Sequence, residues 1–445
     1  MAEDRLQEQG LHRLVRFVGV SALISPAITL GVSVMISRSL GPGGRGAYGV
    51  IVTVVSVLPP LLGFGLDFAI RYWSARAGDN HLQVLKTASA IGLTVGGVGG
   101  SLILVCGALG SPDWLIPSGL GSGGVASYAL IIFLSSLTGM WGNYLTGRER
   151  YGFSTFGRNF SMSLQLLALF ACWLLTSVSL EVALMALLLQ LGTSFVLFLY
   201  LEGKELIPAL HSRLLPRVEL KDMIRYGSWQ YLSSMLLQAN LRLGIFLLVA
   251  MQDLHQTGLY AAILGPIGML WLLSSPLIRV LSARTTRRSD DPEFAQRVAG
   301  AMRLTLLITA AGGGVAAALA PIAVPMLFGD AFADAVEPLL VLIPGTVAFS
   351  VVHVVIQYLA GANRPKWNAM ISAVGAGMTL VMGVWLIPLW GATGAAAAES
   401  IAYLASTAIA TVAFLRVSEL PARKLFVFQR SDFAPVARIL GLGSA

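Results

Sequence analysis

Long apolar stretches recur along the whole chain and are separated by short polar intervals. Each stretch has about 20 residues and few charges, which is the length that an α-helix needs to cross a bilayer. The pattern predicts an all-α polytopic membrane protein of about twelve spans. The predicted spans are 15–37, 47–69, 86–109, 123–145, 157–176, 181–201, 224–250, 258–280, 299–321, 336–360, 368–389 and 392–415.

Composition and charge agree with this topology. Only 12% of the residues are charged, whereas soluble domains have about 25%. With a cytoplasmic N-terminus, alternate intervals contain 27 of the 30 Lys and Arg residues, as the cytoplasmic side of a membrane protein does. This alternation predicts an even number of spans and two cytoplasmic termini. It also explains the net charge of +8 by loops that face anionic lipid, so no nucleic-acid partner is expected.

Short motifs recur in the two halves of the chain, in the same order and at an offset of about 210 residues. The matching segments are 46–48 and 258–260 (GAY and GLY), 71–76 and 279–284 (RYWSAR and RVLSAR), and 145–150 and 359–364 (LTGRER and LAGANR). A duplication predicts a six-helix half at 1–201, a cytoplasmic linker at 202–223, a second six-helix half at 224–415 and a cytoplasmic tail at 416–445. Because six is even, the halves would be related by a pseudo-two-fold axis along the membrane normal, with a substrate site between them.

One arginine is placed deep inside a predicted span. Arg242 follows Gln238 and Asn240 in the seventh span, where an arginine costs at least about 2.5 kcal/mol on insertion scales. It should therefore face a partner or a watery cavity. One interpretation is a substrate-binding cation, with Gln238 and Asn240 beside it, because guanidinium pairs well with phosphate. The other is a structural arginine paired to Glu399 or to carbonyls of a broken helix.

Further polar residues of the spans are candidates for function. Glu399 in the last span is either an ion-coupling carboxylate or a helix-packing contact. His353 and Gln357 are four residues apart, hence on one helix face, and are predicted to bind substrate or to make a satisfied polar contact. Asp67 and Arg71, also four apart, form either an intracellular gate or an anchoring pair. No metal-ligand spacing and no cofactor motif is present.

Aromatic and glycine residues complete the prediction of helix environments. Trp141, Tyr144, Trp367 and Trp390 lie near span ends, which is typical of aromatic belts at the membrane interface. The glycine-rich stretch 92–100 lies inside a span and predicts a close contact between helices.

An ordered set of short motifs resembles a known family. The motifs are SLGPGGRGAY at 39–48, GFGL at 63–66 with Arg71, Gly258-Leu-Tyr260, Leu327-Phe-Gly329 with Phe332, Leu359-Ala-Gly361 with Arg364, and Ile387-Pro388 followed by Gly391 and Gly394-Ala-Ala396. Together they resemble the bacterial polysaccharide-biosynthesis flippases of the multidrug/oligosaccharidyl-lipid/polysaccharide (MOP) exporter superfamily. Members often carry an acidic residue soon after the arginine of the seventh span. Here Leu243-Gly244 follows Arg242, which leaves ion coupling through this helix open.

The resemblance implies a transporter in the bacterial cytoplasmic (inner) membrane, not an enzyme. It would flip a sugar linked to undecaprenyl diphosphate from the inner to the outer face by alternating access, with H⁺ or Na⁺ as the coupling ion. One alternative is a drug/cation antiporter of the same superfamily, which needs cavity carboxylates that this chain lacks apart from Glu399. Another is a polysaccharide polymerase or ligase, for which a long external loop is expected. The last is a flippase-like scaffold without transport.

Overall fold

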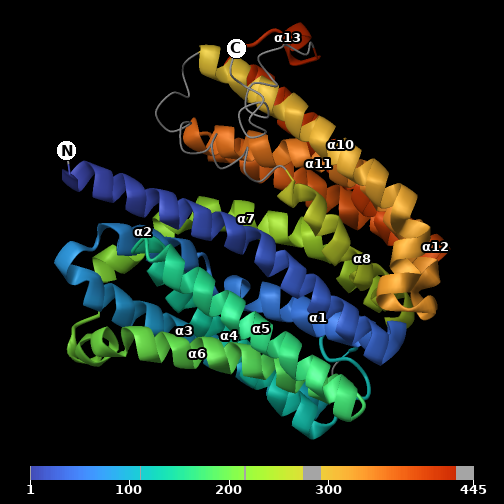
Figure 1. Ribbon diagram of the computed structural model, residues 1–445, viewed down its shortest axis with the longest axis horizontal. Coiled ribbons are helices and arrows are strands. Elements are labelled where there is room, and N and C mark those ends of the chain that lie inside the picture. Colours follow the sequence, from blue (N-terminus) through green and yellow to red (C-terminus); the bar gives the residue numbers. More distant parts are fainter. Residues whose placement is uncertain (1, 111, 215–216, 274–291, 427–445) are drawn as a thin grey trace. The chain divides into compact units, whose positions relative to one another are not determined.

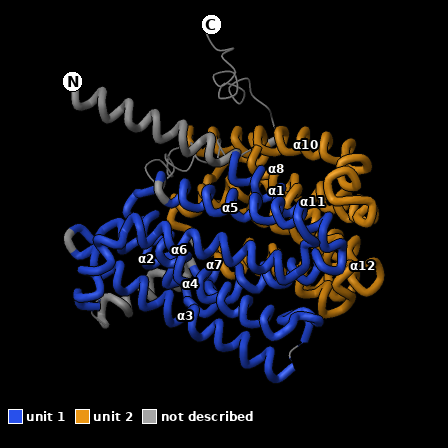
Figure 2. The backbone as a smooth tube through the Cα atoms, turned by 60° about the horizontal axis from the view of Figure 1, so that its bottom comes forward, with its two compact units in different colours: residues 1–232 blue, residues 233–445 orange. Residues whose placement is uncertain are grey.

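The computed structural model describes residues 2–110, 112–214, 217–273 and 292–426. In these ranges all regular structure is helical. The chain divides into two compact units, residues 1–232 and 233–445, which Figure 2 shows in different colours.

The first unit is built from long helices that run back and forth. Its elements are α1 (Ala2–Gly63), α2 (Leu66–Arg76), the 3-10 turn η1 (Gly78–Asn80), α3 (His81–Leu109), α4 (Ser122–Gly147), α5 (Tyr151–Leu175), α6 (Leu180–His211) and the beginning of α7 (Arg217–Met251). Helix α1 breaks at Gly41, whose φ of 64° is a conformation that glycine adopts without steric cost. Helices α3, α4 and α6 lie side by side (Figure 1).

Glycines on one face of α3 set its distance from α4. Gly92, Gly96 and Gly100 repeat every four residues, and a Cβ atom at Gly96 would lie 2.8 Å from the carbonyl oxygen of Phe133. Only small residues allow two backbones to approach this closely. The close helix contact predicted for 92–100 is therefore confirmed.

Aromatic residues of α4 and α6 form part of the core of this unit. Trp141 stacks on Phe198 with ring centroids 4.0 Å apart, and both Trp141 and Tyr144 are buried. The prediction of an interface belt was wrong for Trp141 and Tyr144, because a neighbouring helix covers the face of α4 that they occupy. Trp390 in the second unit is exposed, and its place in such a belt stays a prediction.

The second unit repeats this plan. It contains the rest of α7, α8 (Leu254–Leu272), α10 (Pro292–Phe328), the 3-10 turn η2 (Asp330–Ala335), α11 (Val336–Gly361), α12 (Pro365–Ser418) and α13 (Ala422–Phe426). Helix α12 breaks at Gly391, where φ is 53°. Helix α11 packs along both α10 and α12.

The helices account for the predicted spans. In the described part of the chain, nine helical stretches are long and apolar enough to cross a membrane. Two of them, Ile24–Gly63 and Lys366–Ser418, each contain two predicted spans, separated at Gly41 and Gly391. Helix α8 covers the described part of the predicted span 258–280. The prediction of an all-α polytopic membrane protein with two six-helix halves is confirmed.

The helix breaks follow the same order in both units. Three breaks of the first unit, at Gly41, 110–121 and 176–179, correspond to three of the second, at 252–253, 329 and Gly391. Corresponding breaks are about 210 to 220 residues apart, as expected for a duplicated unit. The boundaries predicted for the linker and tail stay predictions. Helix α6 continues to His211, and α7 begins at Arg217, inside the interval predicted as linker.

Candidate functional site

Arg242 of α7 is half-buried within the second unit. It lies within electrostatic reach of the carboxylate of Glu399 on α12. The guanidinium Nε is buried and has no hydrogen-bond partner among the described residues. No ion pair of 4 Å or less joins Arg242 to Glu399, although both residues are described. Arg242 therefore lies near the carboxylate of Glu399 but forms no salt bridge with it.

Glu399 is almost completely buried, with 1% of its surface exposed. Its Oε1 accepts a hydrogen bond of 2.6 Å from the hydroxyl of Tyr403, which lies one turn further along α12. Its Oε2 is buried and has no partner in the described ranges. A buried carboxylate is costly unless it is paired, so this oxygen is suited to hold a proton or to meet a cation.

Four rings from three helices pack beside this carboxylate. Trp271 of α8 lies 5.0 Å from His353 of α11, and Phe349 of α11 lies 4.4 Å from Tyr403, as distances between ring centroids. We call Trp271, Phe349, His353 and Tyr403 the aromatic cluster. The indole of Trp271 donates a hydrogen bond of 3.1 Å to the carbonyl of Thr346, which fixes its ring.

His353 has a defined orientation in the aromatic cluster. Its Nδ1 lies 3.3 Å from the carbonyl oxygen of Phe349. Because a carbonyl only accepts, Nδ1 carries the hydrogen, and Nε2 is left for a second interaction. His353 is half-buried, whereas Gln357, one turn further along α11, is exposed.

Asn240 and Gln238 have different surroundings from Arg242. Asn240 is fully buried, and its Oδ1 accepts a hydrogen bond of 3.1 Å from Thr379, in the part of α12 that precedes Gly391. Two residues correspond to about 200° around a helix, so Asn240 and Arg242 point in nearly opposite directions. Gln238 is half-buried. The substrate-binding roles predicted for Gln238, Asn240 and Gln357 stay predictions.

The pair predicted as a gate lies in the first unit, on α2. Arg71 donates a hydrogen bond of 2.5 Å from Nη2 to Oδ1 of Asn143 on α4. Asp67 lies in the first turn of α2, where the helix dipole favours a negative charge. No ion pair joins Asp67 to Arg71, both of which are described. The gate stays a prediction.

Comparisons with known proteins define the class of this fold. No protein-family model and no curated protein matches the sequence. Among solved structures, the chain is similar to one described as "Lipid II flippase MurJ, inward closed conformation", with a TM-score of 0.71, 13% identity and 96% of each chain covered. An inward-facing MATE-family multidrug resistance transporter follows, with a TM-score of 0.67, 18% identity, and 88% of this chain and 94% of that chain covered.

A further match is a MOP superfamily transporter from Pyrococcus furiosus Vc1, with a TM-score of 0.63, 16% identity, and 91% of this chain and 95% of that chain covered. The chain is thus a multi-pass α-helical membrane protein. Its fold is that of the MOP superfamily transporters, and at these identities the likeness concerns the fold. The resemblance predicted from the short motifs is confirmed at that level.

Proposed function

We propose that the protein is a MOP-type transporter that flips a lipid-linked oligosaccharide, carried on undecaprenyl diphosphate, across the bacterial cytoplasmic membrane by alternating access. The observation that carries the proposal is the half-buried guanidinium of Arg242, which has a buried nitrogen without a hydrogen-bond partner among the described residues. Both termini would be cytoplasmic, as the distribution of basic residues predicts.

The substrate explains why a cation belongs inside a span. A diphosphate cannot cross hydrocarbon unaided, because burying its charge is costly, while a polyprenyl tail can stay in lipid. Guanidinium presents a planar fork of donors that matches phosphate oxygens. Arg242 would therefore bind the diphosphate, and Trp271 and His353, the half-buried members of the aromatic cluster, would pack against the first sugar.

Glu399 would couple this binding to an ion. When Glu399 is ionised, its unpartnered oxygen attracts Arg242; when it binds H⁺ or Na⁺, that attraction weakens. Arg242 would then be available to the diphosphate. Tyr403 would hold the carboxylate in place through its 2.6 Å hydrogen bond.

The proposal is tested by flipping of fluorescent undecaprenyl-diphosphate sugars in proteoliposomes. We expect Arg242→Ala to lose transport by about 10- to 150-fold, because a hydrogen bond to a charged group contributes about 1.5–3 kcal/mol. Arg242→Lys should retain part of the activity, since it keeps the charge without the planar fork. Arg297→Ala is the matched control, because Arg297 is 56% exposed and pairs only with Glu293 in the described ion pairs. Full activity of Arg242→Ala would refute the proposal.

A drug/cation antiporter is the second candidate, and the aromatic cluster beside a buried carboxylate favours it. Ring faces attract organic cations, and a MATE-family transporter shares the fold. Arg242 argues against this function, because its charge would repel a cationic substrate. Efflux of ethidium from the same vesicles, abolished by Glu399→Gln and accompanied by no lipid flipping, would establish the antiporter.

A further inference from the structure

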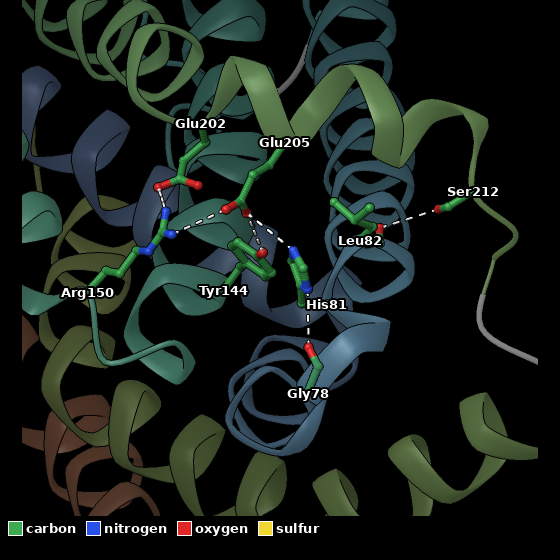
Figure 3. Close-up of polar contacts among 8 residues, drawn as sticks. All are labelled: Gly78, His81, Leu82, Tyr144, Arg150, Glu202, Glu205 and Ser212. Atoms are coloured by element: carbon green, nitrogen blue, oxygen red, sulfur yellow. Dashed lines mark hydrogen bonds and ion pairs between the residues drawn. The ribbon is translucent and has the colours of Figure 1, made fainter.

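A second charged cluster lies in the first unit, away from the residues of the proposed transport site. Arg150, in the turn between α4 and α5, donates hydrogen bonds to two glutamates on α6 (Figure 3). Its Nη1 bonds Glu202, and its Nη2 lies 3.2 Å from Glu205. The hydroxyl of Tyr144 on α4 donates a 3.3 Å hydrogen bond to the other oxygen of Glu205. His81, the first residue of α3, places Nε2 3.8 Å from that same oxygen.

The end of α6 is tied to α3 as well. Nζ of Lys86 donates hydrogen bonds of 2.8 and 2.6 Å to the carbonyl oxygens of Leu210 and Ser212. Carbonyls at the last turn of a helix have no partner within the helix, so this lysine caps α6. The hydroxyl of Ser212 also lies 3.5 Å from the carbonyl oxygen of Leu82. Side chains of α3 and α4 therefore dock the last turns of α6.

Two glutamates of this cluster share one guanidinium, that of Arg150. Glu202 is 2% exposed, and its Oε2 is buried without a hydrogen-bond partner in the described part of the chain. The charges of Glu202 and Glu205 interact unfavourably, and both depend on the single guanidinium of Arg150. Other ionisable groups beside the cluster are His81, Tyr144, Arg148, which lies near Tyr144, and Lys86, which bonds the end of α6.

Arg150 itself does not titrate in this cluster. Its hydrogen bond with Glu202 raises the pKa of the guanidinium above its ordinary value, and the charge of Glu205 acts in the same direction. Arg150 therefore stays charged at every accessible pH. The group placed to take up a proton is Glu202, whose second carboxylate oxygen is buried without a partner among the described residues.

We infer that Glu202 is a proton-binding residue that controls the docking of α6 on α3 and α4. In the docked state the proton lies on the buried carboxyl group of Glu202 and removes its repulsion with Glu205. When α6 undocks, water solvates Glu202 and the proton leaves. The docked state therefore binds the proton more tightly than the undocked state, so acidification favours docking and a rise in pH favours release.

Residues 213 and 214 directly follow the end of α6, so docking of α6 fixes the point at which the chain leaves α3 and α4. The inference does not depend on the transported substrate.

The experiment measures the position of the end of α6 directly, in the full chain without substrate. Spin labels are attached at Leu210→Cys and Asn80→Cys, both at exposed positions, after replacement of Cys106 and Cys172 by Ala. Pulsed electron paramagnetic resonance then gives the distance distribution between the labels as the pH changes. We expect the distance distribution to be narrower at acidic pH and broader and longer at alkaline pH, because the docked state binds the proton more tightly than the undocked state.

Glu202→Gln should give the narrow distribution at every pH, because the amide is neutral and still accepts from Arg150. Glu181→Gln is the matched control; Glu181 lies in the first turn of the same helix and should keep the response of the wild type. A wild-type distribution that does not change with pH would overturn the inference, and so would a Glu202→Gln variant that keeps the full response. A response to Na⁺ at fixed pH, without a response to pH, would also overturn it. A loss of lipid flipping alone would leave these distances unchanged, so the two proposals fail separately.

Discussion

Substitution of Gly345 on α11 tests how closely α11 approaches the part of α12 that follows Gly391 and contains Glu399. A Cβ atom at position 345 would lie 2.5 Å from Cα of Ser400 and 2.7 Å from its carbonyl oxygen. The backbone N–H of Gly345 also donates a 3.0 Å hydrogen bond to the hydroxyl of Ser400. Since favourable carbon contacts lie near 3.5–4.0 Å, Gly345→Ala requires the two backbones to separate by about 1 Å.

The loss of stability expected for Gly345→Ala follows from comparison with a second glycine. Gly377 of α12 is exposed, and a Cβ atom there would have no neighbour within 4 Å. Alanine gains about 1 kcal/mol of helix propensity at either position, so this gain cancels between Gly345→Ala and Gly377→Ala. The difference that remains is the overpacking of α11 against α12, about 1–3 kcal/mol.

Thermal unfolding of the two purified variants in one detergent measures this difference. At about 2–4 °C per kcal/mol for domains of this size, Gly345→Ala should melt about 2–12 °C below Gly377→Ala. Because Ser400 follows Glu399, the flipping rate should fall in Gly345→Ala and stay unchanged in Gly377→Ala. Equal melting temperatures would show that the helices separate at no cost, and the packing argument would be refuted.

Three further predictions concern single polar contacts. Tyr403→Phe removes the hydroxyl that bonds Glu399 and should lower the free energy of unfolding by about 1–3 kcal/mol; an unchanged melting temperature would mean that Glu399 finds another donor. Arg303 is buried and donates to the carbonyl oxygens of Lys424 and Leu425, so Arg303→Ala should speed hydrogen exchange in α13 at least about tenfold, whereas Arg297→Ala should not. Lys86→Ala uncaps α6 and should accelerate tryptic cleavage at the exposed Arg213; cleavage at the wild-type rate would contradict the capping role.

The apolar pattern predicted the helices because the membrane imposes one length on every span. It also predicted the order of the breaks, including those at Gly41 and Gly391, where the chain turns without a loop. It did not predict that α6 continues as a helix through residues 202–211. That segment is polar, and it is held by Arg150 and Lys86, which are far away in the sequence and bond its glutamates and its last carbonyl groups.

The sequence predicted part of the candidate site. Arg242 and Glu399 were singled out because charges inside spans are rare, and the structure brings their charges within reach of each other. Tyr403 was missed, although its spacing of four residues from Glu399 was a usable signal. The contact between Trp271 and His353 joins α8 to α11. No local sequence pattern predicts which two helices pack against each other.

The break at Gly41 has a practical consequence for anyone who wishes to label the protein. Two spans meet there through a single residue with a left-handed backbone, and the same holds at Gly391. An epitope tag inserted at either point would push apart two helices that are joined by a single residue. The stretch 110–121, which contains the exposed Asp113 and Trp114, has room for an insertion. On the predicted topology that stretch faces outward, so it is the place at which an antibody or a surface-anchored probe would reach the intact protein.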